Sequence, residues 1–445
     1  MTSALRIGAG AGFSADRFEP AVDLLQRVDL DVIVFECLAE RTIALGHLER
    51  LIKPDRGFDP FLEERLTQVL PVALEKGVRI VTNMGAANPD GAARAALSIA
   101  RKLGLRMPRI AVIHGDDVTD HVRTTQPSLD TGETVASLGA NLVSANAYIG
   151  ARSIADALET GVDIVMAGRV ADPSLFLGTM LHHFGWADDD WDRLAAGTAI
   201  GHLLECAGQV TGGYFADPGA CDVPDLWNLG FPYAIVAEDG SARLAKTPDT
   251  GGRLDLMTVR AQLFYEVHDP SAYITPDVIA NFTGIELEMA GSDEVLIRGA
   301  KGRARPDQLK ATVSAREGFI GEGQIAYAGI GAMERAALAA EIIRRRIALR
   351  GLDLSDIRID IFGANALHGP QSTPSTGQAS EVVLRVAGRA RDERTAMLLG
   401  QEVQSLLTNG PAGGGGDFRR VKPVIGVHSA LVPRSAAVHQ IKIVE

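Results

Sequence analysis

Cysteine is scarce in this sequence: among 445 residues there are three, Cys37, Cys206 and Cys221. They lack the spacing of a zinc ribbon, and an odd number argues against a disulfide framework. Such usage is typical of a reducing compartment, so we expect a cytoplasmic location. His202 lies one helical turn before Cys206 and could activate its thiol, although a buried structural thiol is the more ordinary interpretation.

Long hydrophobic runs are also missing. No apolar run approaches the roughly 18 to 20 residues of a membrane span, and the first residues lack the basic start and apolar stretch of a signal peptide. Positive charge does not predominate either, because the formal net charge is −12, which disfavours non-specific binding to nucleic acid. We therefore expect neither a membrane nor a nucleic acid as a partner.

The composition that is present, 46% apolar and 22% charged residues, is that of a soluble globular protein. In the first half, short apolar runs alternate with amphipathic stretches, a pattern that gives a parallel sheet covered by helices. We expect an α/β protein whose residues 1–215 form a catalytic domain of βα repeats, either barrel-like or doubly wound. The predicted strands are residues 5–12, 32–37, 78–84, 109–114, 141–147 and 163–167.

Two further regions follow. Residues 216–304 are rich in Gly, Pro and Asp, and predict a connecting region with short strands. Residues 305–445 carry alternating strands and two amphipathic helices in the order βαββα, with a closing strand at 421–427. This order is typical of a split βαβ, or ferredoxin-like, arrangement. The sequence therefore predicts a separate C-terminal α+β domain.

Every predicted strand of the first half ends on polar residues or glycine. The apolar run 32–35 stops at Glu36, and Glu40 and Arg41 follow shortly after it. The carboxyl ends of parallel strands meet at one edge of a sheet, where the chemistry of βα enzymes gathers. Glu40 alone is explained equally well as an acidic residue at a helix N-terminus. We predict catalytic roles for Glu36, Glu40, Arg41, His114 and Asp116, and substrate binding by Asn83, Asn88, Asn146, Arg169 and Asp172.

Glycines accompany the first predicted strand. Gly8, Gly10 and Gly12, together with Glu36, partly match the dinucleotide-binding fingerprint and are candidate cofactor-binding residues. The position of the fingerprint's third glycine is occupied by Phe13, however. The alternative is that these glycines allow close packing or the approach of another ligand to the backbone.

A second glycine-rich stretch spans residues 410–416 and includes Gly413 and Gly414. Three cations, Arg419, Arg420 and Lys422, follow it. Exposed backbone N–H groups beside cations could cradle a phosphate or a CoA-type anion. A flexible turn explains the glycines as well.

Potential metal ligands gather at one place, in His114, Asp116, Asp117, Asp120 and His121. Carboxylates and imidazoles are ligands that a divalent metal accepts. Consecutive residues rarely face one point, however, and Asp is a frequent turn and N-cap residue. The sequence leaves both interpretations open.

Several segments resemble a known family, that of acyclic terpene utilisation protein A. The likeness runs from residue 7 to about residue 434, and it is carried by residues 35–42 (FECLAERT), 82–89 (TNMGAANP), 168–173 (GRVADP), 209–214 and 410–416. The resemblance implies a part in bacterial citronellol and geraniol breakdown, beside enzymes of branched acyl-CoA or carboxylic acid intermediates. It also implies a small additional C-terminal domain in longer relatives. A separately encoded small subunit could take the place of that domain here.

The leading hypothesis is a catabolic lyase, a hydro-lyase or hydratase acting on a branched or unsaturated carboxylate or its acyl-CoA thioester. Proton abstraction beside a carboxyl group needs an acid/base and an electrophilic clamp, and the strand ends offer both. One alternative is an NAD(P)- or flavin-dependent oxidoreductase. Another is a non-catalytic subunit of an acyl-CoA carboxylase system. We also expect a homo-oligomer, with strands 309–314 or 381–386 at its interface, because an uncovered sheet face favours association.

Overall fold

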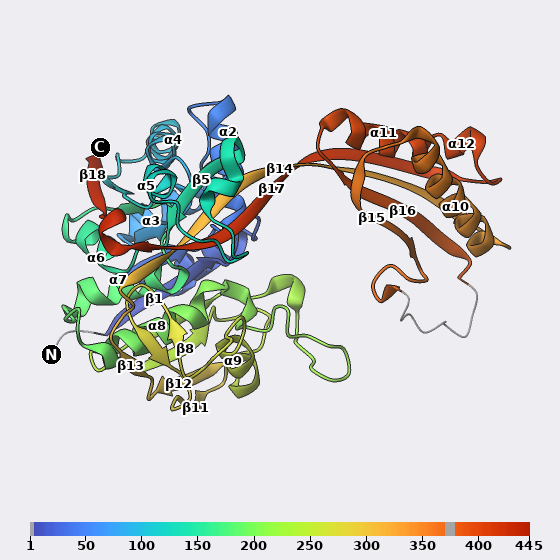
Figure 1. The fold of residues 1–445 in the computed structure, drawn as a ribbon. Coiled ribbons are helices and arrows are strands. Elements are labelled where there is room, and N and C mark those ends of the chain that lie inside the picture. The colour runs from blue at the N-terminus through green and yellow to red at the C-terminus, as the bar shows by residue number, and fades with distance from the viewer. Residues whose placement is uncertain (1–3, 370–378) are drawn as a thin grey trace. The chain divides into compact units, whose positions relative to one another are not determined.

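The computed structural model describes residues 4–369 and 379–445, so residues 1–3 and 370–378 of the expected first and last domains lie outside the described residues. The chain divides into two compact units. Unit 1 comprises Met1–Ser314 and Val427–Glu445, and unit 2 comprises Ala315–Gly426. The expected mixture of helices with parallel and antiparallel strands is confirmed (Figure 1).

Unit 1 is built on a ten-stranded sheet of order β11-β12-β8-β7-β1-β2-β3-β6-β4-β18. Neighbours from β1 to β4 in this order are parallel. The order ends on β11 at one side and β18 (Gln440–Val444) at the other, so the predicted barrel alternative is not found among the described residues. These parallel strands are β1 (Leu5–Ala11), β2 (Val32–Phe35), β3 (Arg79–Thr82), β6 (Ile164–Met166) and β4 (Ile110–His114).

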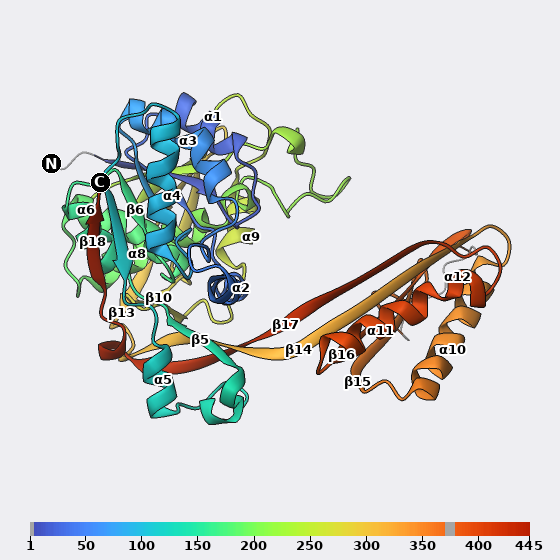
Figure 2. The same ribbon diagram turned by 90° about the horizontal axis from the view of Figure 1, so that it is seen from above.

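Continuous apolar runs explain why these strands lie in the middle of unit 1. All four residues of β2 are buried, as are all three of β6, which is what strands covered on both faces require. Two rows of helices provide this cover, since α1 packs on α3 and α3 on α4, while α6 packs on α7 and α7 on α8. Figure 2 shows α1, α3 and α4 side by side. Their bounds are α1 Glu19–Arg27, α3 Leu62–Lys76, α4 Pro89–Lys102, α6 Arg152–Glu159, α7 Asp172–Phe184 and α8 Trp191–Glu205.

The direction of the chain reverses at β4. From β1 through β2 and β3 to β4 the chain moves one way across the sheet, and from β4 it turns back to β6, which lies between β3 and β4. With right-handed crossovers between parallel strands, α4 (between β3 and β4) and α6 (between β4 and β6) lie on opposite faces of the sheet. Helix α7, which follows β6, packs on α6 and so lies opposite α4. A crevice opens at the carboxyl ends of two such strands, and ligands of open α/β sheets bind there.

One predicted strand of the parallel sheet lies elsewhere. Residues 141–147 do form a strand, β5 (Leu142–Ala147), but it pairs with β14 (Gln308–Ala328) and not with the large sheet. Its second half alternates polar and apolar residues, in the order Ser144, Ala145, Asn146 and Ala147, unlike the continuous apolar runs of the parallel strands. All four are buried, so Asn146 needs partners inside unit 1 and finds them in Asp116 and His47.

Residues 216–304 contribute antiparallel strands to unit 1. Strand β7 pairs with β1, and β8, β12 and β11 extend the sheet beyond it. Three short strands form a separate sheet of order β13-β10-β9. The bounds are β7 Pro232–Val236, β8 Ala242–Lys246, α9 Leu256–Leu263, β9 Tyr273–Ile274, β10 Ile279–Asn281, β11 Glu286–Gly291, β12 Glu294–Arg298 and β13 Lys301–Arg303.

Unit 2 has a sheet of order β15-β16-β14-β17 whose core includes Ile325, Ile343, Leu384 and Leu399. The predicted succession of strand, helix, two strands and helix is present, and the predicted closing strand lies within β17. Both β14 and β17 cross the boundary between the units without interruption. The remaining bounds are α10 Ala332–Arg350, β15 Leu354–Phe362, β16 Glu381–Ala390, α11 Glu393–Gln404, α12 Leu406–Asn409 and β17 Gly415–Pro433.

Among the described residues, none of the helices combines the length and the apolar character needed to cross a lipid bilayer.

Candidate active site

Glu36 follows β2 directly and points into the interior of unit 1, with an exposed fraction of 8%. Its Oε1 accepts hydrogen bonds from the backbone N–H of Leu38 (2.8 Å) and from Nδ2 of Asn83 (2.9 Å). Asn83, at the end of the neighbouring β3, also accepts from the N–H of Cys37 (2.8 Å). Burial raises the pKa of Glu36 well above its usual range, and the nearby Asp172 adds to this effect, while Arg169 opposes it. Glu36 is therefore a weaker acid than an exposed glutamate.

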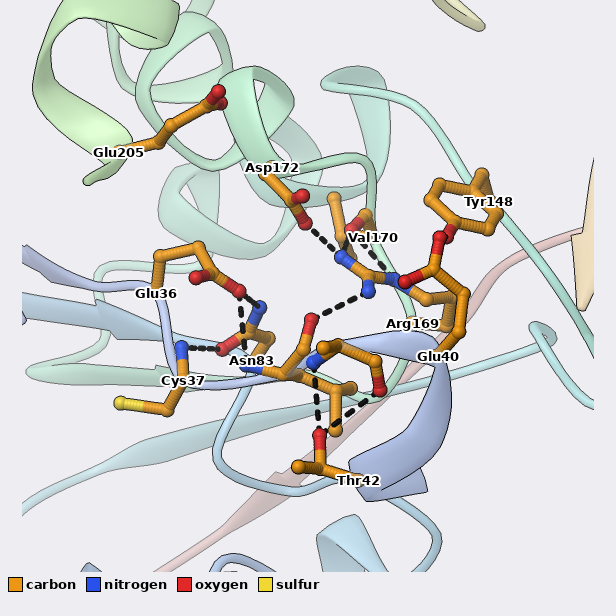
Figure 3. Close-up of polar contacts among 12 residues, drawn as sticks. Glu36, Cys37, Glu40, Thr42, Asn83, Tyr148, Arg169, Val170, Asp172 and Glu205 are labelled. Carbon is orange, nitrogen blue, oxygen red and sulfur yellow. Dashed lines mark hydrogen bonds and ion pairs between the residues drawn. The ribbon is translucent and has the colours of Figure 1, made fainter. Parts of the chain in front are cut away.

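Arg169 follows β6 and is completely buried. Figure 3 shows its guanidinium held among acceptors of the protein. Nε and Nη2 donate to the carbonyl oxygen of Val170 (3.0 and 2.6 Å), Nη1 donates to that of Leu38, and Nη2 also pairs with Asp172. These bonds occupy most of the guanidinium's donors and hold Asp172 and the loop after β2 in place. The substrate-binding role of Arg169 stays a prediction.

Glu40 is the first residue of α2 (Glu40–Ile52), in the helix N-terminal position that the sequence also allowed. Its Oε1 accepts from the hydroxyl of Tyr148 and from Nζ of Lys310 (3.1 Å). Although burial opposes ionisation, these two donors lower the pKa of Glu40 to about 2. Burial, and then the charge of Glu40, raise the pKa of Tyr148. Glu40 is thus a permanent anion, and Tyr148 keeps its proton.

Glu40, Tyr148 and Lys310 face a cavity of about 570 Å³ in unit 1. Asp172, the first residue of α7, also lies in its wall, with 38% of its side chain exposed. Burial raises the pKa of Asp172, while Arg169 opposes this effect. The cavity therefore presents two carboxyl groups whose pKa values move in opposite directions, the arrangement that separates an acid/base group from a fixed anion. Its wall also contains Tyr148, Ala171, Pro173, Tyr273, Ile274, Leu309, Lys310 and Leu431.

Two more predicted residues support the floor of this site. Asp116, after β4, accepts hydrogen bonds from the backbone N–H of Arg169 (2.9 Å) and from Nδ2 of Asn146 (3.0 Å). Asn146 is also hydrogen-bonded through Oδ1 to Nε2 of His47 (2.9 Å). Asp116 and Asn146 are both buried, and their hydrogen bonds connect the loop after β4 with strand β5 and with the loop after β6. Asp116 fixes the backbone of Arg169, and Asn146 holds Asp116 in place.

Other predicted residues do not join the site. Asn88 caps α4, since its Oδ1 accepts from the N–H of Gly91 (3.0 Å) and its Nδ2 donates to the carbonyl oxygen of Arg56 (2.8 Å). Arg41 is exposed on α2. His114 pairs with Asp90 (3.2 Å) near the edge strand β18. Of these three residues only His114 ends a strand, because Asn88 is the N-cap of α4 and Arg41 is the second residue of α2.

The predicted metal cluster does not converge either. Asp116 is bound within the floor, whereas Asp117 accepts from the hydroxyl of Thr119 (2.6 Å) and Asp120 is exposed. In residues 4–369 and 379–445, no group of three or more His, Cys, Asp or Glu side chains is arranged to hold a metal ion. The turn and capping interpretation of this segment fits the structure.

The glycines of the first strand serve packing. Gly8 and Gly10 lie within β1, and a Cβ would come within 2.6 Å of Leu30 and 2.4 Å of Phe35, respectively. Gly12 lies equally close to the backbone of Cys206. A dinucleotide fingerprint needs its glycines in the turn after the strand, whereas Gly8 and Gly10 lie inside β1. Gly12 does follow β1 and lines a further cavity, so a cofactor-binding role at this position stays a prediction.

The second pair of predicted cofactor-binding glycines lies in unit 2. Gly413 has a left-handed backbone (φ +73°), and a Cβ on Gly414 would lie 2.8 Å from Ile325. The carbonyl oxygen of Ala412, beside them, accepts from Arg335 (2.9 Å). Turn geometry and packing thus account for both glycines.

A protein-family model described as "Acyclic terpene utilisation family protein AtuA" matches residues 5–443. The chain belongs to this family. No curated protein and no solved structure matches it. Three of the segments that carry the resemblance meet at the site: residues 35–42 supply Glu36 and Glu40, residues 82–89 supply Asn83, and residues 168–173 supply Arg169 and Asp172.

Two glycines in these family segments, Gly85 and Gly168, allow close backbone contact between the loops after β3 and β6. A Cβ on Gly85 would lie 2.4 Å from the carbonyl oxygen of Ala167, and one on Gly168 would lie 2.9 Å from the carbonyl oxygen of Ala86. Neighbouring Ala86 has φ +44°, a strained value for a residue with a side chain. Close contact at the crevice therefore accounts for the small residues of these segments.

The lowered pKa of Glu40 makes a prediction for stability. A carboxyl group whose pKa is lower in the folded than in the unfolded state stabilises the fold at every pH above its unfolded-state pKa. For Glu40 this contribution is lost as the pH falls towards its folded-state pKa of about 2. The free energy of unfolding of wild type should therefore exceed that of Glu40→Gln at pH 7, and the difference should shrink from pH 5 to pH 3. Urea unfolding at several pH values measures it, with the exposed Asp120→Asn as control. A difference independent of pH would contradict the assignment.

Proposed function

We propose that the protein is a hydro-lyase or hydratase of acyclic terpene utilisation that acts on a branched or unsaturated carboxylate or its acyl thioester. One observation carries this proposal: Asp172 and the Tyr148–Glu40–Lys310 group face the same 570 Å³ cavity. Dehydration beside a carboxyl group needs a base, a proton donor and a cation for the carbonyl oxygens. The cavity wall contains one residue suited to each task.

In the elimination direction, the carboxylate of Asp172 accepts the proton from the carbon next to the substrate carbonyl. Its raised pKa brings it nearer to neutral pH, which makes it a better base than an ordinary aspartate. The ammonium group of Lys310 neutralises the charge that develops on the carbonyl oxygens. Lys310 is therefore the substrate cation of this proposal.

The carbon–oxygen bond then breaks, and the leaving hydroxyl group takes the proton of Tyr148 to depart as water. A tyrosine with a raised pKa still protonates hydroxide, because water has a pKa of 15.7. Tyrosinate regains its proton from Asp172, directly or through water, so protons balance over the cycle. Hydration runs through the same steps in reverse. Glu40 remains charged throughout and holds Tyr148 and Lys310 in place.

The test is incubation of the purified protein with a panel of 3-hydroxy and α,β-unsaturated acids and their CoA thioesters in ²H₂O. We expect water loss or addition for some member of the panel, and incorporation of deuterium next to the carbonyl group, both followed by NMR. Tyr148→Phe should abolish water loss but retain deuterium exchange. A folded protein that exchanges no proton on any substrate, with or without divalent metal ions, would refute the proposal.

Partners are a separate proposal. We expect a homo-oligomer with β14 or β16 at its interface, or binding to a small co-encoded subunit. Size-exclusion chromatography with light scattering tests self-association, and co-purification with the product of a neighbouring small gene tests the second version. A monomer near 47 kDa that binds no such protein would exclude both.

A further inference from the structure

A second cavity of about 200 Å³ adjoins the active-site cavity within unit 1. Leu309 lies in the walls of both, and the chain neighbours Pro276–Asp277 and Arg305–Pro306 each contribute one residue to either cavity. The ionisable residues in the wall of the second cavity are Arg152, Arg305, Arg434, His439, Asp188 and Asp277.

The two acidic residues of this wall already have partners. Asp188 pairs with Arg152, whose Nε donates to it at 3.0 Å. Asp277 accepts from the hydroxyl of Ser174 (2.5 Å) and from the backbone N–H of Ala151 (2.8 Å), and burial raises its pKa. The ion pair of Arg152 with Asp188 balances the charge on that side of the cavity. The hydrogen bonds from Ser174 and Ala151 each satisfy one carboxylate oxygen of Asp277.

On the rest of the wall two arginines, Arg305 and Arg434, face one acidic residue, Asp277. Arg434 donates to the carbonyl oxygens of Pro306 (3.2 Å) and Pro276 (2.8 Å), which accounts for two of the five N–H groups of a guanidinium. Arg305 is exposed. Burial and the charge of Arg305 lower the pKa of Arg434, although Asp277 and Asp307 oppose this effect. Two like charges held together beside a cavity are stabilised by an anion between them.

We infer that this cavity binds a phosphate group of the same ligand whose reactive end occupies the active-site cavity. Two guanidinium groups match a doubly charged phosphate, and the cavity has room for one such group. The inference rests on the proposed function and narrows it, because a free branched acid carries no phosphate whereas a phosphorylated carrier thioester does. His439, paired with Asp156 (3.0 Å), closes the cavity from the loop before β18.

Isothermal titration of the full chain with CoA, 3′-dephospho-CoA, pantetheine and inorganic phosphate tests the inference. We expect CoA to bind at least about tenfold more tightly than pantetheine, a difference of about 1.4 kcal/mol. Arg305→Gln should weaken CoA by about tenfold and leave pantetheine unchanged. Arg303→Gln, which removes an exposed arginine outside the cavity wall, is the matched control.

Equal affinities for CoA and pantetheine, or CoA binding that ignores Arg305→Gln, would overturn the inference. Inorganic phosphate that binds without competing with CoA would assign the cavity to the free ion and overturn the carrier version as well. Arginine-dependent CoA binding without any turnover would leave the inference standing while the proposed reaction failed. If the protein turned over free acids, and Arg305→Gln did so equally well, the proposed reaction would stand and the inference would fail.

Discussion

Replacing Arg169 with methionine should destabilise unit 1 by about 3–5 kcal/mol, the usual cost of removing one partner of a buried ion pair. Methionine fills part of the space but satisfies neither Asp172 nor the carbonyl oxygens of Leu38 and Val170. Three carboxyl groups of unit 1, those of Glu36, Asp172 and Glu205, would also lose the positive charge that now opposes the rise of their pKa values.

The destabilisation should depend on pH. Buried carboxyl groups without a cation have folded-state pKa values above their unfolded ones, so they destabilise the fold progressively as pH rises above about 4. The deficit of Arg169→Met should therefore be larger at pH 8 than at pH 5, measured by urea unfolding. Arg152→Met, which removes a partly exposed arginine paired with Asp188, should cost about 0–1 kcal/mol. Equal deficits for the two variants would show that Arg169 has no special structural role.

Asp172→Asn should reduce turnover by about 10²–10⁴-fold, the range expected when a general acid/base is lost. Asparagine keeps the shape of the side chain and can accept from Arg169, but it cannot exchange a proton at neutral pH. Deuterium incorporation next to the substrate carbonyl should fall in parallel with turnover, because both need the same base.

The matched control is Asp307→Asn, which changes another carboxylate in the wall of the same cavity and should leave turnover within about threefold. Glu36→Gln, at the residue predicted from the sequence as the base, should lose less activity than Asp172→Asn, because Glu36 does not line the cavity and its Oε1 is held by Leu38 and Asn83. If Glu36→Gln lost proton exchange while Asp172→Asn kept it, the two roles would have to be reversed.

The meeting of Glu36 with Asn83 could be predicted from the sequence, because each ends a short apolar run and consecutive strands of this kind lie side by side. The approach of Arg169 and Asp172 to this pair followed only from the more general rule that the carboxyl ends of parallel strands share one edge, because β4 and β5 lie between β3 and β6 in the chain. Their tasks could not be predicted, since the acceptors of Arg169 are backbone carbonyl oxygens, which no residue type reveals. Gly8 and Gly10 misled for a related reason, as a glycine that makes room for Phe35 looks the same in sequence as one that admits a ligand.

Tyr148 and Lys310 were missed entirely, and the reason is distance along the chain. They meet because β5 pairs with β14, and the backbone N–H of Tyr148 donates to the carbonyl oxygen of Lys310 (2.9 Å). Local periodicity carries no information about pairing between segments so far apart. A signal was nevertheless present in the sequence, because Tyr148, an aromatic residue with a hydroxyl group, directly follows the predicted fifth strand and lies two residues after Asn146.

The pairing of β18 with β4 has a consequence for how the protein is made. Residues 440–444 are synthesised after the whole of unit 2, about 330 residues later than the strand they cover. At a translation rate of roughly 5–20 residues per second, the edge of β4 waits on the ribosome for about 15 to 65 s with its backbone N–H and C=O groups unpaired. An uncovered edge strand invites pairing with other nascent chains. Expression at lower temperature, or with abundant chaperones that shield such edges, should therefore increase the recovered yield more than stabilising either core would.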